Sequence, residues 1–326
     1  MRELAYVRAL NEALWEEMER DESVFLIGED IADCGGVFGV SRRLLERFGR
    51  RRVRQTPLSE SAFLGLAVGA AMTGLRPVAE IMYVDFVTVC MDPIANQAAK
   101  LRFMSGGQLT LPLVIRTQQG SGTCEAAQHS QSLEAWFAHI PGLKVVLPAT
   151  PADAKGLLKS AIRDDNPVIF LEHKLLYPLR GPVPEGEFQI PLGQAEVKRE
   201  GTDITVVATS LMVHKALEAA DRLAGEVSVE VVDPRTLVPL DMDCLAASVR
   251  KTGRLLVVQE ACTCGGFGSE IVRRVVEECF DALRAAPKVL GSANLPVPFS
   301  PPLEQACLPQ VETIIAEIRR GLQHGN

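Results

Sequence analysis

The sequence predicts an α/β protein built from two doubly wound domains, each with a mostly parallel sheet covered by helices on both faces. Its 326 residues suggest two domains. Short, continuously apolar runs alternate with helical stretches, which is typical of parallel strands buried on both faces. A stretch rich in proline and glycine interrupts this alternation near residue 180.

The first half of the chain begins with an amphipathic helix over 4–20, which places Val7, Leu10, Leu14 and Met18 on one face. A second helix is expected over 61–73. A third is expected to open at Thr150, with Thr as the N-cap and Pro151 at the first helical position. The expected strands cover 24–27, 78–82, 113–116, 145–147 and 168–171.

The alternation stops over 176–192 and then resumes, so we expect a first domain over 1–177, a linker over 178–193 and a second domain over 194–326. The linker is marked by Pro178, Pro182, Pro184 and Pro191. In the second domain the expected strands cover 204–208, 227–232 and 255–259, and the expected helices cover 213–223, 241–250, 269–283 and 311–322.

Composition narrows the class of protein. The net charge of −7 and the dispersed basic residues argue against nucleic-acid binding, which requires clustered positive charge. No apolar run approaches the roughly 20 residues that span a bilayer, and no secretory signal is recognised at the start. We therefore expect a soluble, cytoplasmic protein. The eight cysteines contain no CxxC pair, and Cys262-Thr263-Cys264 is read as reduced thiols or as a metal or redox site.

Several nucleotide and hydrolase motifs are absent. The sequence contains no GxxxxGK[ST] loop, no GxSxG elbow and no HExxH helix. The segment 265–268, Gly-Gly-Phe-Gly, follows a predicted strand but lacks the spacing of a dinucleotide-binding loop. These absences argue against a stand-alone reductase, hydrolase or kinase.

Three positions near the expected carboxyl ends of strands could carry chemistry, because ligands of open α/β sheets bind at that edge. Glu60 ends the segment 56–60 and is either a functional carboxylate or a helix N-terminal residue favoured by the dipole. Phe86 is either a ligand platform or a core residue. His129 lies in a loop of small residues, where it could act as an acid or base near neutral pH.

Taken together, these motifs resemble one family over residues 25–304. The chain is similar to the β subunits of the pyruvate, branched-chain and acetoin dehydrogenase complexes. That family pairs a pyrimidine-binding domain with a transketolase-type C-terminal domain. The matching stretches are 28–30, 35–38, 56–60, 74–78, 98–100, 105–107, 128–131, 141–146, 153–157 and 161–164.

The resemblance assigns roles around thiamine diphosphate, which acts as an electron sink in decarboxylation. It implies that Glu60 contacts the N1′ nitrogen of the aminopyrimidine and favours the tautomer that can remove the thiazolium proton. Phe86 would stack on the pyrimidine ring, Leu58 would offer its carbonyl to the amino group, and Glu29 would belong to a buried relay. His129 resembles the histidine implicated in reductive acyl transfer to lipoamide.

The resemblance also implies partners. The companion α subunit of the family carries a Gly-Asp-Gly motif that holds Mg²⁺ and the diphosphate, and this chain has no such motif. We therefore expect an α2β2 heterotetramer with shared active sites, served by a lipoyl-bearing dihydrolipoamide acyltransferase core. The family also suggests a structural K⁺ held by Leu113, Ala161, Ile162, Asp164 and Asn166.

The expected activity is oxidative decarboxylation of pyruvate with acyl transfer to lipoamide, and the alternative is cleavage of acetoin. Segments 172–177 and 296–300 lean towards acetoin, whereas Gln55 and Pro93 depart from the usual Asp and Gln. A non-catalytic assembly subunit and a transketolase-like half enzyme acting on sugars are further readings. The second lacks the phosphate-binding basic residues that sugar phosphates would need.

Overall fold

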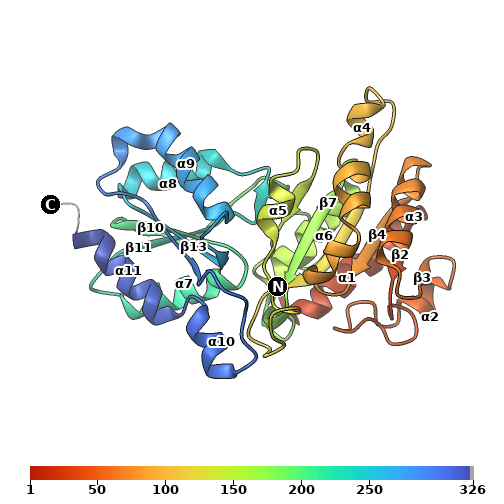
Figure 1. Cartoon of the computed structure of the whole chain (residues 1–326), viewed down its shortest axis with the longest axis horizontal. Helices are drawn as coiled ribbons and strands as arrows, with labels where there is room; N and C mark the ends of the chain where they lie inside the picture. The colour runs from red at the N-terminus through yellow and green to blue at the C-terminus, as the bar shows by residue number, and fades with distance from the viewer. Residues whose placement is uncertain (324–326) are drawn as a thin grey trace. The chain divides into compact units, whose positions relative to one another are not determined.

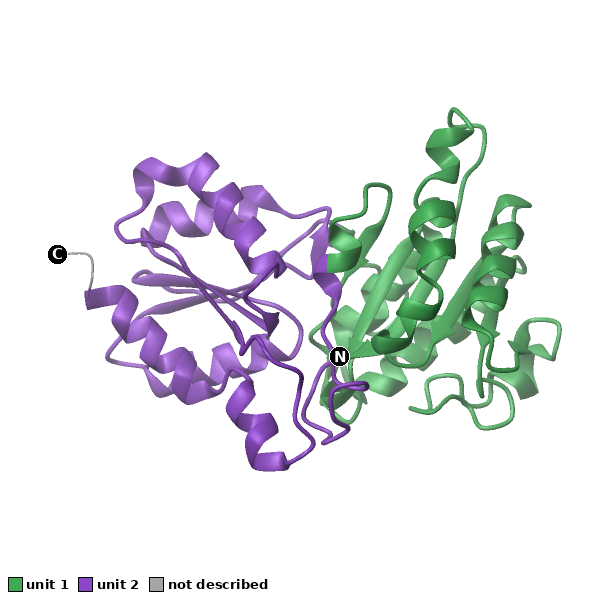
Figure 2. Ribbon diagram, viewed as in Figure 1, with its two compact units in different colours: residues 1–119, 136–192 green, residues 120–135, 193–326 purple. Residues whose placement is uncertain are grey.

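The computed structural model describes residues 1–323 and divides into two compact units (Figure 2). Unit 1 comprises residues 1–119 and 136–192, and unit 2 comprises 120–135 and 193–326. The segment 120–135, which carries His129, therefore belongs to unit 2 although it lies within the first half of the sequence.

Unit 1 is built around six parallel strands in the order β6-β7-β5-β4-β2-β3. They are flanked by helices, of which α1 packs against α6 and α3 against η2 (Figure 1). From the amino end to the segment before residue 119, the elements are β1 (Arg2–Ala5), α1 (Tyr6–Arg20), β2 (Val24–Gly28), α2 (Leu44–Phe48), β3 (Val53–Gln55), α3 (Glu60–Met72), β4 (Arg76–Ile81), η1 (Val84–Val89), η2 (Pro93–Ala98), α4 (Leu101–Met104) and β5 (Val114–Gln119).

The rest of the first half comprises α5 (Glu134–Ala138), β6 (Lys144–Val146), α6 (Pro151–Arg163), β7 (Val168–His173), η3 (Lys174–Leu176) and β8 (Arg180–Val183). The start of α6 confirms the predicted cap: Thr150 accepts from the Asp153 amide at 3.1 Å, Asp153 accepts in return from the Thr150 amide at 3.2 Å, and Pro151 holds the first position. β8 pairs antiparallel with β1, so a short strand lies inside the stretch that the sequence predicts as a linker.

Unit 2 has a five-stranded sheet in the order β14-β13-β10-β11-β9, in which the edge strand β9 is antiparallel and the others are parallel. Helices α8 and α9 lie on one side of the sheet and α7 and α11 on the other (Figure 1). The elements are β9 (Glu196–Arg199), β10 (Ile204–Ala208), α7 (Leu211–Arg222), β11 (Val229–Asp233), β12 (Thr236–Val238), α8 (Met242–Thr252), β13 (Leu255–Cys262), α9 (Phe267–Cys279), η4 (Phe280–Ala282), β14 (Lys288–Ser292), α10 (Pro301–Cys307) and α11 (Val311–Gln323).

The predicted fold class is confirmed, since both units are α/β with mostly parallel sheets. Strand β2 is buried along its whole length and is an unbroken apolar run, whereas the equally buried β10 and β11 also carry Thr205, Glu230 and Asp233. Within residues 1–323, the structure has no helix with both the length and the apolar character that crossing a membrane requires.

In unit 1 the order of the strands places a switch point between β2 and β4. The chain passes from β2 to its neighbour β3 on one side, and then to β4 on the other. In open α/β sheets this reversal leaves a crevice at the carboxyl ends of the strands. Glu29 follows β2 at this edge, the segment that leads to Glu60 follows β3, and the segment that leads to Phe86 follows β4.

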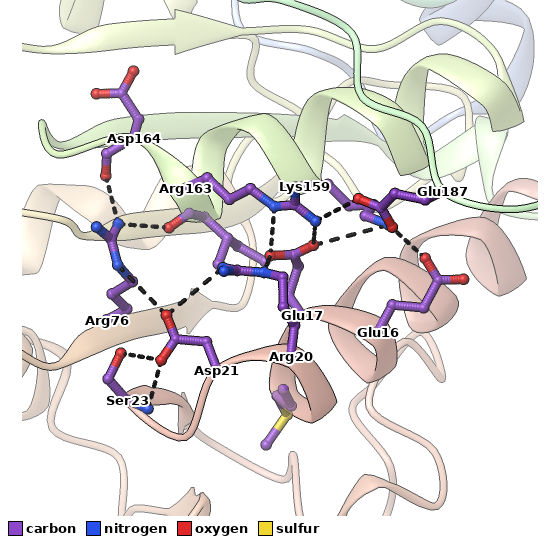
Figure 3. A network of polar contacts seen from close by, with 12 residues as sticks. Glu16, Glu17, Arg20, Asp21, Ser23, Arg76, Lys159, Arg163, Asp164 and Glu187 are labelled. Atoms are coloured by element: carbon purple, nitrogen blue, oxygen red, sulfur yellow. Dashed lines mark hydrogen bonds and ion pairs between the residues drawn. The ribbon is translucent and has the colours of Figure 1, made fainter.

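A network of charged side chains joins α1 to α6 and to residue 187 within unit 1 (Figure 3). Glu17 is fully buried and accepts from Arg163 at 2.6 and 2.9 Å and from Arg20 at 2.8 Å. Lys159, also fully buried, bonds to Glu16 at 2.6 Å and to Glu187 at 2.5 Å. Because Glu17 and Lys159 are buried away from water, their stability depends on keeping their partners.

Replacing Glu17 with Gln should destabilise the chain by about 3 kcal/mol, because the fully buried Lys159 and the partly buried Arg163 would lose the carboxylate that lies near both. Urea unfolding measures this free energy. The matched control is Glu19→Gln on the same helix, where the carboxylate is 44% exposed and pairs with Arg47 at the surface. We expect the control to cost less than about 0.5 kcal/mol. Equal losses in the two variants would contradict the buried role of Glu17.

Candidate active site

Glu60 is the first residue of α3 and lies half-buried at the carboxyl edge of the unit 1 sheet. Its place in the first helical turn puts a carboxylate where the helix dipole favours negative charge. The next side chain, Ser61, donates to the Val89 carbonyl at 2.5 Å and so fixes the start of α3 against the end of η1. Both the helix and the strand edge therefore determine where Glu60 lies.

Glu29 lies beside Glu60, with only 4% of its surface exposed. Its carboxylate accepts from the Ser59 amide at 3.3 Å, one residue before Glu60. Burial raises the pKa of Glu29, and the neighbouring charge of Glu60 raises it further. Burial, followed by the charges of Glu60 and Glu29, also raises the pKa of the Cys90 thiol to about 12. The structure thus brings the two predicted carboxyl groups together beside a neutral thiol.

Phe86 lies on η1, which packs against α3, and is half-buried. Its ring meets that of Tyr83 edge to face, with centroids 6.1 Å apart. Tyr83 has a φ of 62°, a costly conformation for an aromatic residue, and its amide donates to the Gln118 side chain at 3.1 Å. Gln118 on β5 therefore helps to fix the turn that precedes Phe86. The sequence alone did not predict this role of Gln118.

Leu58 lies two residues before Glu60, and it is 78% exposed. The first amides of α3, at Ala62 and Phe63, bind the Ser59 carbonyl at 2.9 and 3.1 Å. In the part of the chain that the structure describes, no donor reaches the Leu58 carbonyl, so it can accept a hydrogen bond from a ligand. Val89 is also 58% exposed, so the rim of the site is apolar.

A fully buried ionic cluster underlies the site, and sequence reasoning missed it. Arg116 on β5 donates to both oxygens of Glu172 on β7 and to Glu80 on β4, each at 2.7 Å. The Tyr177 hydroxyl donates to Glu172 at 2.6 Å, and burial raises the pKa of Tyr177 well above its ordinary value. A partial signal was present, because Glu80, Arg116 and Glu172 each follow apolar residues of their own strand.

The departure from the family at Gln55 has a structural role. Its side-chain oxygen accepts from the amides of Ala32 and Asp33, at 3.2 Å each, and so holds the loop that follows Glu29. Pro93 occupies the first position of η2, where the absence of an amide hydrogen costs nothing. Neither departure removes one of the expected site residues.

His129 belongs to unit 2, in a segment held by two acids of that unit. Glu260 accepts from the Ser121 amide at 2.6 Å, and Glu304 accepts from the Gly122 amide at 2.8 Å. The His129 amide lies 3.5 Å from the Ala126 carbonyl, which closes the turn before the histidine. Glu60 thus belongs to unit 1 and His129 to unit 2.

The five residues suggested for K⁺ gather where α6 meets β5 and β7. The carbonyls of Ile162 and Asp164 both accept hydrogen bonds from the Arg76 guanidinium, at 3.0 and 3.1 Å. The Asp164 carboxylate binds Lys144 and accepts from the Asn166 amide at 2.9 Å. A monovalent cation would have to share these oxygens through their second lone pairs. Within residues 1–323, no group of three or more His, Cys, Asp or Glu side chains could hold a metal ion.

All eight cysteines are free within the described chain. Cys262 donates to the carbonyl of Cys264 at 3.4 Å, so the close pair forms a turn contact.

Two domain families match this sequence. Residues 2–180 match the family described as "Transketolase, pyrimidine binding domain", and residues 193–314 match "Transketolase, C-terminal domain". Among solved structures, "Split gene transketolase, inactive beta4 tetramer" aligns with a TM-score of 0.82 over 99% of each chain, at 23% identity. This likeness shows the fold: the chain is a two-domain α/β protein of the transketolase-like class.

Its relatives define the family more narrowly. The chain is 50% identical to the "Acetoin:2,6-dichlorophenolindophenol oxidoreductase subunit beta" of Cupriavidus necator, over 99% of both chains. It is 45% identical to the "Pyruvate dehydrogenase E1 component subunit beta-2, mitochondrial" of Oryza sativa subsp. japonica, over 98% of this chain and 86% of the relative. It is also 45% identical to the "2-oxoisovalerate dehydrogenase subunit beta" of Bacillus subtilis, over 97% and 98%. The chain belongs to this family of dehydrogenase β subunits, and the predicted family is confirmed.

Ionisation of Glu29 should make the chain less stable as the pH rises. A raised folded-state pKa gives stability that is fully present below the ordinary value of 4.5 and is lost as the pH climbs through the raised value. Glu29→Gln cannot ionise and retains an oxygen for the Ser59 amide. The stability of the variant relative to the parent should therefore grow from about pH 4.5 upwards and then level off.

Urea unfolding at a series of pH values measures this difference. A constant difference across the series would show that Glu29 ionises normally in the folded chain. Glu46→Gln, at an exposed position in unit 1, is the control and should show no such trend.

Proposed function

We propose that this chain binds the aminopyrimidine half of thiamine diphosphate and supplies the β half of the active site in a 2-oxo acid dehydrogenase component of the pyruvate dehydrogenase type. One observation carries the proposal: the Glu29 and Glu60 carboxyl groups lie together at the switch point of the unit 1 sheet, where η1, which carries Phe86, packs against α3. A pair of neighbouring carboxyl groups, one buried and one half-buried, at a ligand-binding edge suits an exchangeable proton shared with a ring nitrogen.

The available groups fit an aminopyrimidine. When bound, the cofactor supplies an electron sink for the carbanion formed on loss of CO₂. Glu60 would hold a proton at the ring N1′ atom, and Glu29 would favour a proton within the pair because two adjacent carboxylates repel each other. The Leu58 carbonyl would accept from the exocyclic amino group, and the Phe86 ring would set the plane of the pyrimidine.

The proposed site is incomplete without a partner. The chain lacks the Gly-Asp-Gly motif that the family uses for Mg²⁺ and the diphosphate. Large apolar side chains are exposed on the same unit, namely Leu58, Leu66, Val89, Phe103 and Met104. Such apolar exposure suits a surface that another subunit covers. We propose an α2β2 heterotetramer, with Mg²⁺ held by the α subunit, that delivers acyl groups to a lipoyl-bearing acyltransferase core.

Two finer assignments belong to the same proposal. The pyrimidine-binding domain spans 1–177, a linker spans 178–193 and the C-terminal domain spans 194–326, although 120–135 cluster with the C-terminal unit. A structural K⁺ would use the carbonyl edge of Leu113, Ala161, Ile162, Asp164 and Asn166, sharing it with Arg76.

Acetoin is the second candidate substrate. It is favoured by the relative at 50% identity, which is named an acetoin oxidoreductase and matches over 99% of both chains. Reconstitution with a cognate α subunit would separate the two substrates, because each can be assayed by reduction of an artificial dye. Turnover of sugar phosphates by the same pair would instead support a transketolase-like half enzyme.

Glu60→Gln should lower the thiamine-diphosphate-dependent activity of the reconstituted pair by about 100-fold or more, because an amide cannot hold and release the proton at N1′. The measurement is oxidation of pyruvate and of acetoin with saturating cofactor. The matched control is Glu46→Gln, an exposed acid in the first turn of α2. A Glu60 variant that keeps more than about a tenth of the activity would overturn the proposal.

His129→Ala should separate two half-reactions. If His129 serves as the acid or base in acyl transfer, lipoyl-dependent turnover should fall by about 100-fold while dye-dependent turnover stays within about threefold. His139→Ala, at an exposed histidine, is the control and should change neither. Full lipoyl-dependent activity in the His129 variant would assign acyl transfer to another group and favour a scaffolding role for this loop.

A further inference from the structure

The segment 120–135 is joined to the C-terminal unit by a fully buried acid, Glu304, on the short helix α10. Only 1% of Glu304 is exposed. Its Oε1 atom accepts from the Gly122 amide at 2.8 Å and from the Cys124 amide at 3.3 Å, and its Oε2 atom accepts from the same Cys124 amide and from the Cys124 thiol, each at 3.3 Å. One carboxylate therefore serves three donors of one turn.

The turn held by Glu304 is conformationally strained. Cys124 and Ala126 have φ values of 58° and 62°, in the left-handed region that residues with a side chain rarely adopt. Such conformations persist only where surrounding contacts enforce them. The hydrogen bond to Glu304, together with burial, raises the pKa of Cys124, so the thiol stays protonated and continues to donate.

Packing alone does not hold the loop. A cavity of about 390 Å³ lies between the loop and the sheet end of unit 2, lined by Ser121, Ser130, Glu260 and residues 292–297 among others. Ser130 is 2% exposed, and among residues 1–323 its hydroxyl has no hydrogen-bond partner. Because the cavity leaves few packing contacts on this side of the loop, its conformation depends largely on the hydrogen bonds to Glu260 and Glu304.

We infer that Glu304 is a positioning residue for His129: it holds the strained turn at 122–126 and thereby fixes the backbone that presents the histidine. The inference rests on the acyl-transfer role proposed for His129. Glu304 lies on α10, 175 residues after His129 in the sequence. The inference gives it a part in the lipoyl-dependent half-reaction but no part in binding the pyrimidine.

Kinetics of three variants in the reconstituted α and β pair test this role. Glu304→Ala should lower lipoyl-dependent kcat by about 10- to 100-fold, with dye-dependent turnover and the KM for thiamine diphosphate within about twofold. Glu304→Gln retains the oxygen that serves both amides, so it should restore lipoyl-dependent kcat to within about threefold. Glu312→Ala, at an exposed acid of α11, is the control. If the Ala variant loses both activities in parallel, Glu304 only stabilises the unit and the inference fails.

A double variant distinguishes the possible failures. Glu304→Ala combined with His129→Ala should be no slower than His129→Ala alone, because both changes remove one function. A multiplicative loss would overturn the inference. If His129→Ala itself has no effect, the proposed role of His129 has failed independently of Glu304.

Hydrogen exchange provides a readout that does not depend on activity. In Glu304→Ala, the amides of Gly122 and Cys124 should exchange at least about tenfold faster, while amides in β10 and β11 stay unchanged. The Gln variant should resemble the parent, and it supplies the comparison if the Ala variant does not fold. Unchanged exchange at Gly122 and Cys124 in a folded Ala variant, or fast exchange there in the Gln variant, would contradict the anchoring role.

Discussion

The unit 1 site depends on a single buried cation, Arg116, held between two carboxylates on neighbouring strands. Its guanidinium binds Glu172 through two parallel hydrogen bonds and Glu80 through a third. The desolvation of these ions is costly and is offset only while all partners remain. Since Glu80, Arg116 and Glu172 belong to β4, β5 and β7, the cluster locks the relative register of three strands just before their carboxyl ends. Those ends are where the candidate site begins.

The cluster reaches Phe86 through a series of rings. The Tyr177 hydroxyl caps Glu172, and its ring stacks on Phe38 with centroids 4.9 Å apart. Phe38 meets Tyr83 at 5.8 Å, and Tyr83 meets Phe86 at 6.1 Å. Edge-to-face and stacked contacts restrict ring orientation more than aliphatic packing does. The orientation of the Phe86 ring is therefore set by a series of ring contacts that begins at the buried ionic cluster.

Local signals in the sequence were sufficient to predict the apolar strands and the cap at Thr150, because burial on both faces and helix capping act over a few residues. The proximity of Glu29 and Glu60 was available only through the resemblance to a family. The pairing of Arg116 with Glu80 and Glu172 spans 36 and 56 residues and requires the strand order, which periodicity does not reveal. The bonds from Glu304 to the His129 segment span 180 and more residues and place that segment in the other unit. The short strands β1 and β8 lie near the two ends of unit 1 in the sequence and pair with each other. Neither contains an apolar run from which a strand could be predicted.

The like-charged pair of Glu29 and Glu60 at the switch point bears on how the proposed ligand would bind. Burial raises the pKa of Glu29, and repulsion from Glu60 raises it further. A ring nitrogen that shares its proton with Glu60 would reduce the negative charge that Glu29 experiences. By linkage, such a ligand would lower the pKa of Glu29 and would be bound more tightly in the protonation state that it favours. The repulsion within the pair would thus contribute to the affinity for a basic heterocycle, and the Ser59 amide holds Glu29 in place.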